Sequence, residues 1–102
     1  MRIIWSALAE EQLDKIFNYY EMSAGYNVAS KMIIEIIKKP NKLMNSPYIG
    51  QKEELLKHRK IPYRYLIHKN YKIIYSVDID NELIKIADVF DTRQNPQKLE
   101  RN

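Results

Sequence analysis

The spacing of hydrophobic residues changes once along this chain, from a helical repeat in the first half to a strand-like repeat in the second. Up to Asn45, apolar residues recur three or four positions apart, as they do in amphipathic helices. From Tyr63 onward, short runs rich in tyrosine and isoleucine alternate with turn residues, as they do in strands. A chain of 102 residues has room for one compact domain. We therefore predict that residues 1–102 form a single α+β domain.

The first half is predicted to contain one strand and two helices. Ile3, Ile4 and Trp5 are β-branched or aromatic and predict a strand over residues 2–5, and the Ser6 hydroxyl can cap a helix of about four turns after it. A break at Ser23 and Gly25 separates this helix from a second one, which kinks or stops before Pro40. Glu10, Glu11, Gln12, Asp14 and Lys15 are expected on the polar side of the first helix, and Val28, Met32, Ile33, Ile36 and Ile37 on the apolar side of the second.

The second half is predicted to form a meander of three strands. Residues 63–68 and 71–77 favour a hairpin closed by Lys69 and Asn70, and residues 83–90 suit a strand in the middle of the sheet. The polar tail, residues 97–102, is expected to fray. The predicted order is β-α-α-β-β-β, with an antiparallel helical hairpin packed on one face of a mostly antiparallel sheet and the other face partly open.

Composition excludes several classes of site. The chain has no cysteine, two histidines and two glycines, so thiol chemistry, a closed metal site and a glycine-rich phosphate loop are not expected. We therefore predict no metal and no cofactor. The apolar runs are too short to cross a bilayer, and the first residues lack the pattern of a signal peptide, so we expect a cytoplasmic protein with no membrane partner.

Positive charge is concentrated in one segment. The net charge is +4, yet residues 55–77 contain no acidic residue and six lysines or arginines. These cations either form a solvated face or attract a polyanion. Alternation along the strands would bring about half of them onto the uncovered face of the sheet, where they would line a basic concavity.

Several short motifs in order along nearly the whole chain resemble one protein family. They are Trp5, Ser6, Ala9, Leu13, Ile16 and Tyr20; Ser46, Pro47 and Gly50; residues 63–66 and 71–75; and Val89, Phe90, residues 92–96 and Leu99. This pattern is similar to the RelE/ParE superfamily of type II toxin–antitoxin toxins, and to its ParE branch more than to its RelE branch.

The resemblance implies a growth-inhibiting toxin of the plasmid-stabilisation type, neutralised by a cognate antitoxin that wraps the helices and sheet. Members similar to ParE bind DNA gyrase without a catalytic group of their own, whereas members similar to RelE cleave messenger RNA on the ribosome. The toxin would contact operator DNA only through its antitoxin. A third possibility is a non-toxic module that serves only in antitoxin binding or autoregulation.

The catalytic groups of the RelE branch are poorly matched. Tyr63 and Tyr65 stand where that branch has a lysine pair, and no tyrosine follows Tyr75. The protein is therefore expected not to be an enzyme. A metal-independent endoribonuclease remains as the alternative, using a substitute set of His68 as base or acid, Lys72 and Arg93 as phosphate-binding cations and Tyr75 as proton donor. His68 could instead be a solvated strand end, and Arg93 could pair with Asp91 or Asp88.

Binding candidates fall into two groups. Exposed tyrosine and methionine are favoured at protein interfaces, so Tyr19, Met22 and Tyr26 near the helical hairpin are candidates for antitoxin binding. Candidates for target contact are the cations Lys57, Arg59, Lys60, Arg64, Lys72 and Arg93.

Overall fold

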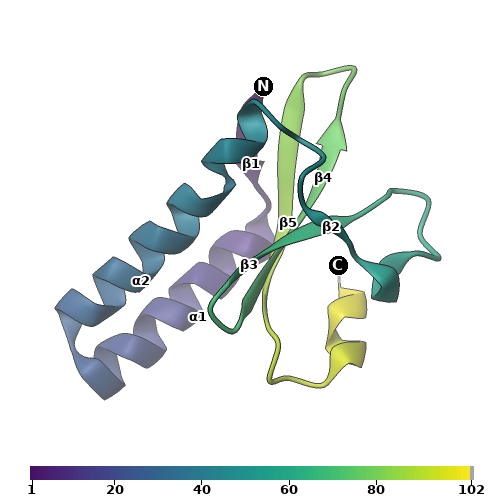
Figure 1. Cartoon of the computed structure of the whole chain (residues 1–102). Helices are drawn as coiled ribbons and strands as arrows, with labels where there is room; N and C mark the ends of the chain where they lie inside the picture. The colour runs from purple at the N-terminus through teal and green to yellow at the C-terminus, as the bar shows by residue number, and fades with distance from the viewer. Residues whose placement is uncertain (102) are drawn as a thin grey trace.

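A five-stranded sheet carries a hairpin of two helices on one face (Figure 1). The computed structural model describes residues 1–101. The strand order is β1-β5-β4-β3-β2, with β1 and β5 parallel and the other neighbours antiparallel. This confirms the predicted α+β class and the interior position of the last strand, which lies between β1 and β4. The elements are β1 (Arg2–Trp5), α1 (Ala7–Ala24), α2 (Tyr26–Lys38), η1 (Lys39–Met44), β2 (Gln51–Lys52), η2 (Glu54–Leu56), β3 (Arg64–His68), β4 (Tyr71–Asp78), β5 (Leu83–Asp91) and η3 (Pro96–Arg101).

Ser6 alone joins β1 to α1, and its groups serve both elements. Its hydroxyl accepts a hydrogen bond from the Ala9 N–H at 3.0 Å, which confirms the predicted helix cap. Its N–H donates to the Ile86 carbonyl at 2.9 Å, and its hydroxyl donates to the Ala87 carbonyl at 2.8 Å. Ser6 therefore fixes where α1 begins relative to β5.

Ala87 is the extra residue of a β-bulge. Ile74 pairs with Asp88 and Tyr75 pairs with Ile86, so Ala87 has no partner on β4. The bulge changes the alternation, because Ile86 and Val89 both pack on the side of the helices although they are three residues apart. The hydrogen bond from Ser6 satisfies the Ala87 carbonyl at this irregular position.

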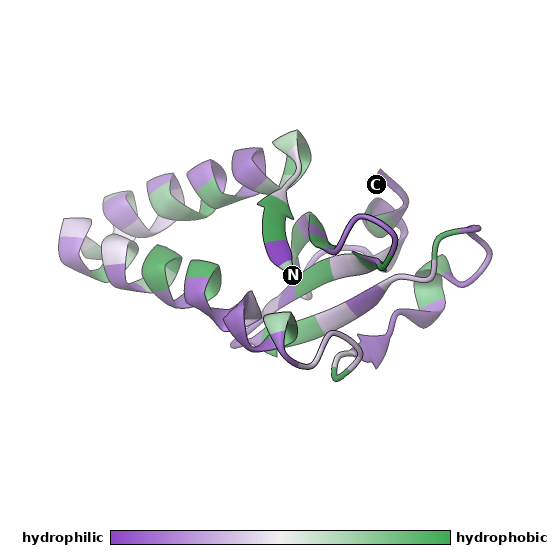
Figure 2. Ribbon diagram, turned by 90° about the horizontal axis from the view of Figure 1, so that it is seen from above, coloured by the Kyte–Doolittle hydropathy of each residue, from purple (hydrophilic) through white to green (hydrophobic). Residues whose placement is uncertain are grey.

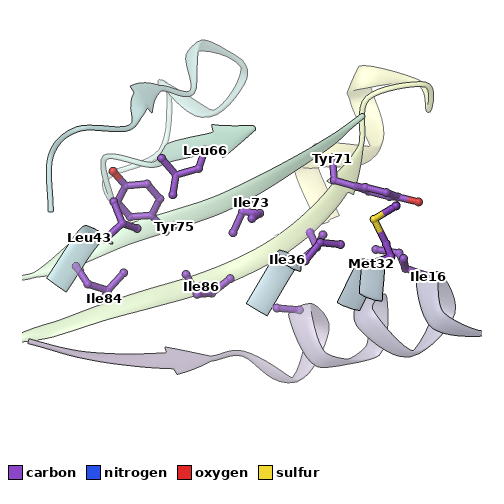
Figure 3. Packing of buried hydrophobic residues seen from close by; sticks show 12 residues of the cluster. Ile16, Met32, Ile36, Leu43, Leu66, Tyr71, Ile73, Tyr75, Ile84 and Ile86 are labelled. Atoms are coloured by element: carbon purple, nitrogen blue, oxygen red, sulfur yellow. The ribbon is translucent and has the colours of Figure 1, made fainter. Parts of the chain in front are cut away.

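The main hydrophobic core lies between the helical hairpin and what we call the helix face of the sheet (Figure 3). Figure 2 shows the two helices as a separate layer beside the strands. Buried Ile36 of α2 and buried Ile73 of β4 meet in this layer. Gly25 alone separates the two helices. Its φ of 93° allows the chain to turn sharply between the end of α1 and the start of α2.

The opposite, reverse face is covered over its middle by the chain itself. Leu56 of η2 and Leu99 of η3 are buried there against Ile74 and Phe90. The basic concavity predicted from the strand cations is therefore wrong, because apolar side chains from two short helices occupy that surface. Residues 96–101 form η3, anchored by Leu99, rather than a frayed tail; Asn102 lies outside the described residues.

Helix length and hydropathy decide whether a helix could span a membrane. Among residues 1–101, no helix combines the length and the apolar character needed to span a membrane.

The double role of Ser6 predicts a local loss of stability on Ser6→Ala. Removing the hydroxyl leaves the Ala9 N–H and the Ala87 carbonyl without this partner, so the free energy of unfolding should fall by about 1–2 kcal/mol. Ser23→Ala is the matched control, because the Ser23 hydroxyl bonds only within the exposed surface of α1, to the Tyr19 carbonyl. Urea denaturation of both variants measures the difference, and equal stabilities would show that Ser6 does not hold the junction.

Candidate functional site

The four residues of the substitute ribonuclease set do not converge. Tyr75 lies in the core on the helix face, whereas Lys72 lies on the reverse face against Tyr65 and Glu53. His68 reaches α2, where its Nε2 lies 3.3 Å from Glu35 Oε1. Arg93 follows the end of β5. General acid–base catalysis needs its groups within hydrogen-bond reach of one reacting centre, and this arrangement does not provide one.

Tyr75 has a structural task that occupies its hydroxyl. The fully buried phenol donates to the Pro47 carbonyl at 2.8 Å and accepts from the Gly50 N–H at 3.0 Å. A Cβ at Gly50 would lie 2.5 Å from the Tyr75 oxygen, so only glycine fits here. Burial raises the pKa of Tyr75. The side chain holds the loop that precedes β2.

Lys72 is neutralised inside the fold. Its Nζ lies 2.7 Å from Oε2 of Glu53, whose side chain is 2% exposed, and 4.3 Å from the centroid of the Tyr65 ring. A buried carboxylate needs such a partner because an unpaired buried charge is strongly unfavourable. Lys72 therefore anchors the segment between β2 and η2 and does not lie open to a phosphate.

Arg93 pairs with a neighbouring carboxylate, as the local salt-bridge interpretation predicted. Its Nε lies 3.0 Å from Asp91 Oδ1 and its Nη2 lies 2.8 Å from Asp91 Oδ2. Hydrogen bonding from Arg93 lowers the pKa of the Asp91 carboxyl to about 2, and hydrogen bonding to Asp91 raises the pKa of Arg93. The guanidinium is thereby held in one orientation at the end of β5.

His68 is half of an incomplete pair with α2. Within residues 1–101, neither the buried His68 Nε2 nor the buried Glu35 Oε1 makes a hydrogen bond. Lys69 Nζ lies 3.9 Å from the same carboxylate oxygen. The predicted solvated strand end is wrong, because the side chain is 15% exposed and packs beside the helix.

Three target-contact candidates gather around one cavity, which we call the basic hollow. Lys57, Arg59 and Lys60 line it together with Lys52 and with the carboxylates of Glu53 and Glu54, and its volume is about 250 Å³. Arg59 and His58 both pair with Glu100 of η3, which fastens the loop. Within residues 1–101, Lys52, Lys57 and Lys60 form no ion pair. Lys52 carries no sequence signal of its own, because a two-residue strand leaves no period to detect.

The other target-contact candidates lie elsewhere. Arg64 donates to the carbonyls of Tyr48 and Gly50 and lies over the Tyr48 ring. Lys72 and Arg93 are held in the ion pairs described above. The basic hollow therefore depends on β2 and the loop before β3 rather than on the long strands of the meander.

The antitoxin candidates are exposed side chains of the last two turns of α1 and of the first residue of α2. Tyr19, Met22 and Tyr26 are 56%, 90% and 66% exposed. Edge-on ring contacts, Phe17 with Tyr26 and Tyr19 with Tyr20, hold the aromatic side chains in place. Toward the N-terminus of α1 a cavity of about 330 Å³ continues between the helices, lined by Leu13, Phe17, Ile33 and Ile37 with Glu10 and Asp14. This surface suits the apolar side of an amphipathic partner.

The described residues show no preformed metal centre. In residues 1–101, no three histidine, aspartate or glutamate side chains lie close enough to share an ion.

Comparisons with known proteins agree on one family. A family model described as "ParE toxin of type II toxin-antitoxin system, parDE" matches residues 3–96. A solved structure described as a chromosomal ParDE toxin–antitoxin system from P. aeruginosa is 19% identical. It covers 89% of this chain and 95% of its own, with a TM-score of 0.73. No curated protein sequence matches significantly.

The two hydrogen bonds of Tyr75 predict a structural rather than a chemical phenotype for Tyr75→Phe. Because the change leaves the Gly50 N–H and the Pro47 carbonyl unpaired, the free energy of unfolding should fall by about 1–3 kcal/mol. The exposed Tyr26→Phe control should change it by less than about 0.5 kcal/mol. Denaturation and RNA-cleavage assays on both variants check this. Unchanged stability together with loss of an RNA-cleaving activity would assign Tyr75 a catalytic role instead.

Proposed function

The chain belongs to the ParE toxin family of type II toxin–antitoxin systems, and we propose that it inhibits bacterial growth by binding DNA gyrase rather than by catalysis. The observation that carries this proposal is that the four candidate catalytic side chains lie far from a common centre. Every residue of the substitute ribonuclease set lies in a separate place and has a structural neighbour of its own.

Two of the dispersed groups already have structural partners, which supports binding over catalysis. The phenol of Tyr75 and the ammonium of Lys72 already form close hydrogen bonds inside the fold. Freeing either of them for a phosphate would leave a buried polar or charged partner unsatisfied, at a cost of several kcal/mol. A ribosome-dependent nuclease would have to pay this cost in each turnover.

The basic hollow is the surface that we propose for target contact. Its three unpaired lysines, Lys52, Lys57 and Lys60, can engage carboxylates of a protein target at little cost, because no internal pair has to break. The toxin would act in the cytoplasm, where gyrase works.

We propose the tip of the hairpin and the adjoining groove as the antitoxin site. The exposed aromatic and methionine side chains offer anchors of the kind that dominate protein interfaces. The Glu10 and Asp14 carboxylates on the groove favour a partner segment with basic residues beside its apolar side. Contact with operator DNA would come only through that antitoxin.

A supercoiling assay with purified gyrase tests the target. The protein should block supercoiling, and the double change Lys57→Gln and Lys60→Gln should weaken inhibition about tenfold. The double change Lys31→Gln and Lys42→Gln removes the same charge far from the basic hollow and should leave inhibition unaltered. Normal supercoiling together with cleavage of ribosome-bound messenger RNA would contradict the gyrase proposal and favour the ribonuclease function. Survival of cells that contain abundant folded protein would instead indicate a non-toxic module.

Binding of the cognate antitoxin tests the hairpin tip. Met22→Glu places a charge at an almost fully exposed anchor, so the affinity should fall at least about tenfold without loss of stability. Ile79→Glu is the matched control, because Ile79 is 53% exposed at the turn between β4 and β5. Calorimetric titration measures both, and equal affinities would place the antitoxin elsewhere.

A further inference from the structure

The cover of the reverse face leaves one part of that face open, near β1. Leu56 and Leu99 pack over the middle of the face, and two cavities of about 360 and 250 Å³ lie next to this cover. The two cavities share Ile61, Ser76 and Lys85, so they form one continuous groove, which we call the edge groove. Most of its lining is apolar and comes from β1, β4, β5 and the loop before β3.

The edge groove exists because β3 is shorter than β4. Arg64, the first residue of β3, pairs with Tyr75, so from Ser76 onward β4 has no further neighbour on this side among the described strands. Ser76, Lys85 and Ile4 are cross-strand neighbours. They lie on the reverse face, because the residues before and after each of them pack in the core on the helix face. These three side chains therefore form the floor of the groove.

Three isoleucines that line the edge groove are open to solvent. Ile4, Ile61 and Ile79 are 41%, 51% and 53% exposed. Within residues 1–101, none of the three belongs to either buried cluster of hydrophobic residues. Exposed apolar side chains that gather in one groove are typical of a surface that binds another protein. The edge groove therefore offers apolar area that the fold itself does not use.

The edge groove continues into the basic hollow. The two share Lys60, Pro62 and Tyr63 as lining residues. Three lysines of the hollow form no ion pair within residues 1–101, and the only carboxylate of the hollow in the same condition is that of Glu54, because Glu53 is paired with Lys72. A surplus of positive charge therefore adjoins the apolar surface.

The lining near the turn between β4 and β5 carries no such surplus. Lys85 Nζ lies 3.0 Å from Asp78 Oδ2, and Asp80 adds a carboxylate there. A complementary partner therefore has its carboxylates over the basic hollow and its apolar side chains along the edge groove.

Charge also distinguishes among three kinds of occupant. A twofold dimer would bring this patch of one copy against the same patch of the other, so the lysines of both copies would repel each other. The antitoxin site proposed above carries the carboxylates of Glu10 and Asp14 and favours a basic segment, which does not suit a surface rich in lysine. An acidic segment of the target suits both the lysines and the isoleucines.

We propose that the edge groove and the basic hollow together bind one segment of gyrase in which apolar side chains adjoin several carboxylates. The apolar side chains would pack against Ile4, Ile61 and Ile79, and the carboxylates would pair with Lys57 and Lys60. This inference rests on the proposed action on gyrase for the identity of the partner. It adds an apolar anchor to a contact that charge alone would make weak and sensitive to salt.

Calorimetric titration of the full-length chain with purified gyrase tests the apolar part of the contact. Ile61→Ser should weaken binding about tenfold, because Ile61 lines both cavities of the edge groove. Ile34→Ser is the matched control and should leave the affinity unchanged, since Ile34 is also 51% exposed but lies on α2. Burial of apolar surface gives a negative heat-capacity change of binding, and its magnitude should be smaller for Ile61→Ser.

A second variant and measurements of stability separate binding from folding. Ile4→Thr removes apolar area but keeps a β-branched side chain in β1, and it should also weaken binding. Melting temperatures establish that each variant is folded. If Ile61→Ser and Ile4→Thr bind gyrase as tightly as Ile34→Ser, the edge groove does not contact gyrase, although gyrase remains the target. Loss of self-association or of antitoxin binding in Ile61→Ser, with gyrase binding intact, would also overturn the proposal and would assign the groove to that partner.

Failure of the gyrase assignment itself gives a different result, because the unchanged protein would then not bind gyrase. Growth inhibition by the same variants decides about the groove in that case. Toxicity that is lost in Ile61→Ser and kept in Ile34→Ser would support target contact at the edge groove and replace gyrase as the partner. Equal toxicity of the two variants would overturn the role of the groove as well.

Discussion

The hydrogen bonds of Ser6 to β5 determine the arrangement of the whole domain. Its N–H extends the pairing of β1 with Ile86, and its hydroxyl turns to the carbonyl of the bulged Ala87 while capping α1. Because a single residue makes the transition from strand to helix, α1 leaves β1 in one direction only. The helix then packs against the second half of β5, where Ile16 and Val89 belong to one buried cluster. The bulge and the cap therefore determine how α1 lies on the sheet.

Internal ion pairs explain why Lys72 and Arg101 are held in separate structural positions. Glu53 and Asp88 are buried carboxylates, and each requires a cation, which Lys72 and Arg101 supply. The two pairs fasten the segments that bring Leu56 and Leu99 over the reverse face. These two cations therefore hold the segments that cover the reverse face, whereas Lys57 and Lys60 on the loop before β3 form no ion pair within residues 1–101.

Local signals were sufficient to predict most of the fold. The residues of β1, the cap at Ser6 and the turn at Lys69, where φ is 53°, depend only on near neighbours, so the sequence predicts them well. The interior position of the last strand followed from apolar residues on both of its sides. The short β2, η2 and η3 escaped detection because elements of two to six residues do not establish a period.

The candidate site was harder to predict because it depends on contacts between distant residues. Arg64 and His68 share a face with Leu66, toward the helices, whereas the neighbouring Lys72 faces the opposite way; only the register of β3 and β4 decides this. Gln12 became buried because the chain beyond β5 folds back beside α1. No local spacing carries that information.

The parallel pairing of β1 with β5 also has a consequence for biosynthesis. Ile3 aligns with Ile84, so the first strand to emerge from the ribosome pairs with the last one. Until β5 emerges, β1 lacks its neighbour and β4 lacks one of its two, and the apolar sides of the helices have only part of a sheet to pack on. Native structure of this kind forms late and in one cooperative step rather than gradually behind the growing chain, because its decisive pairing spans almost the entire domain.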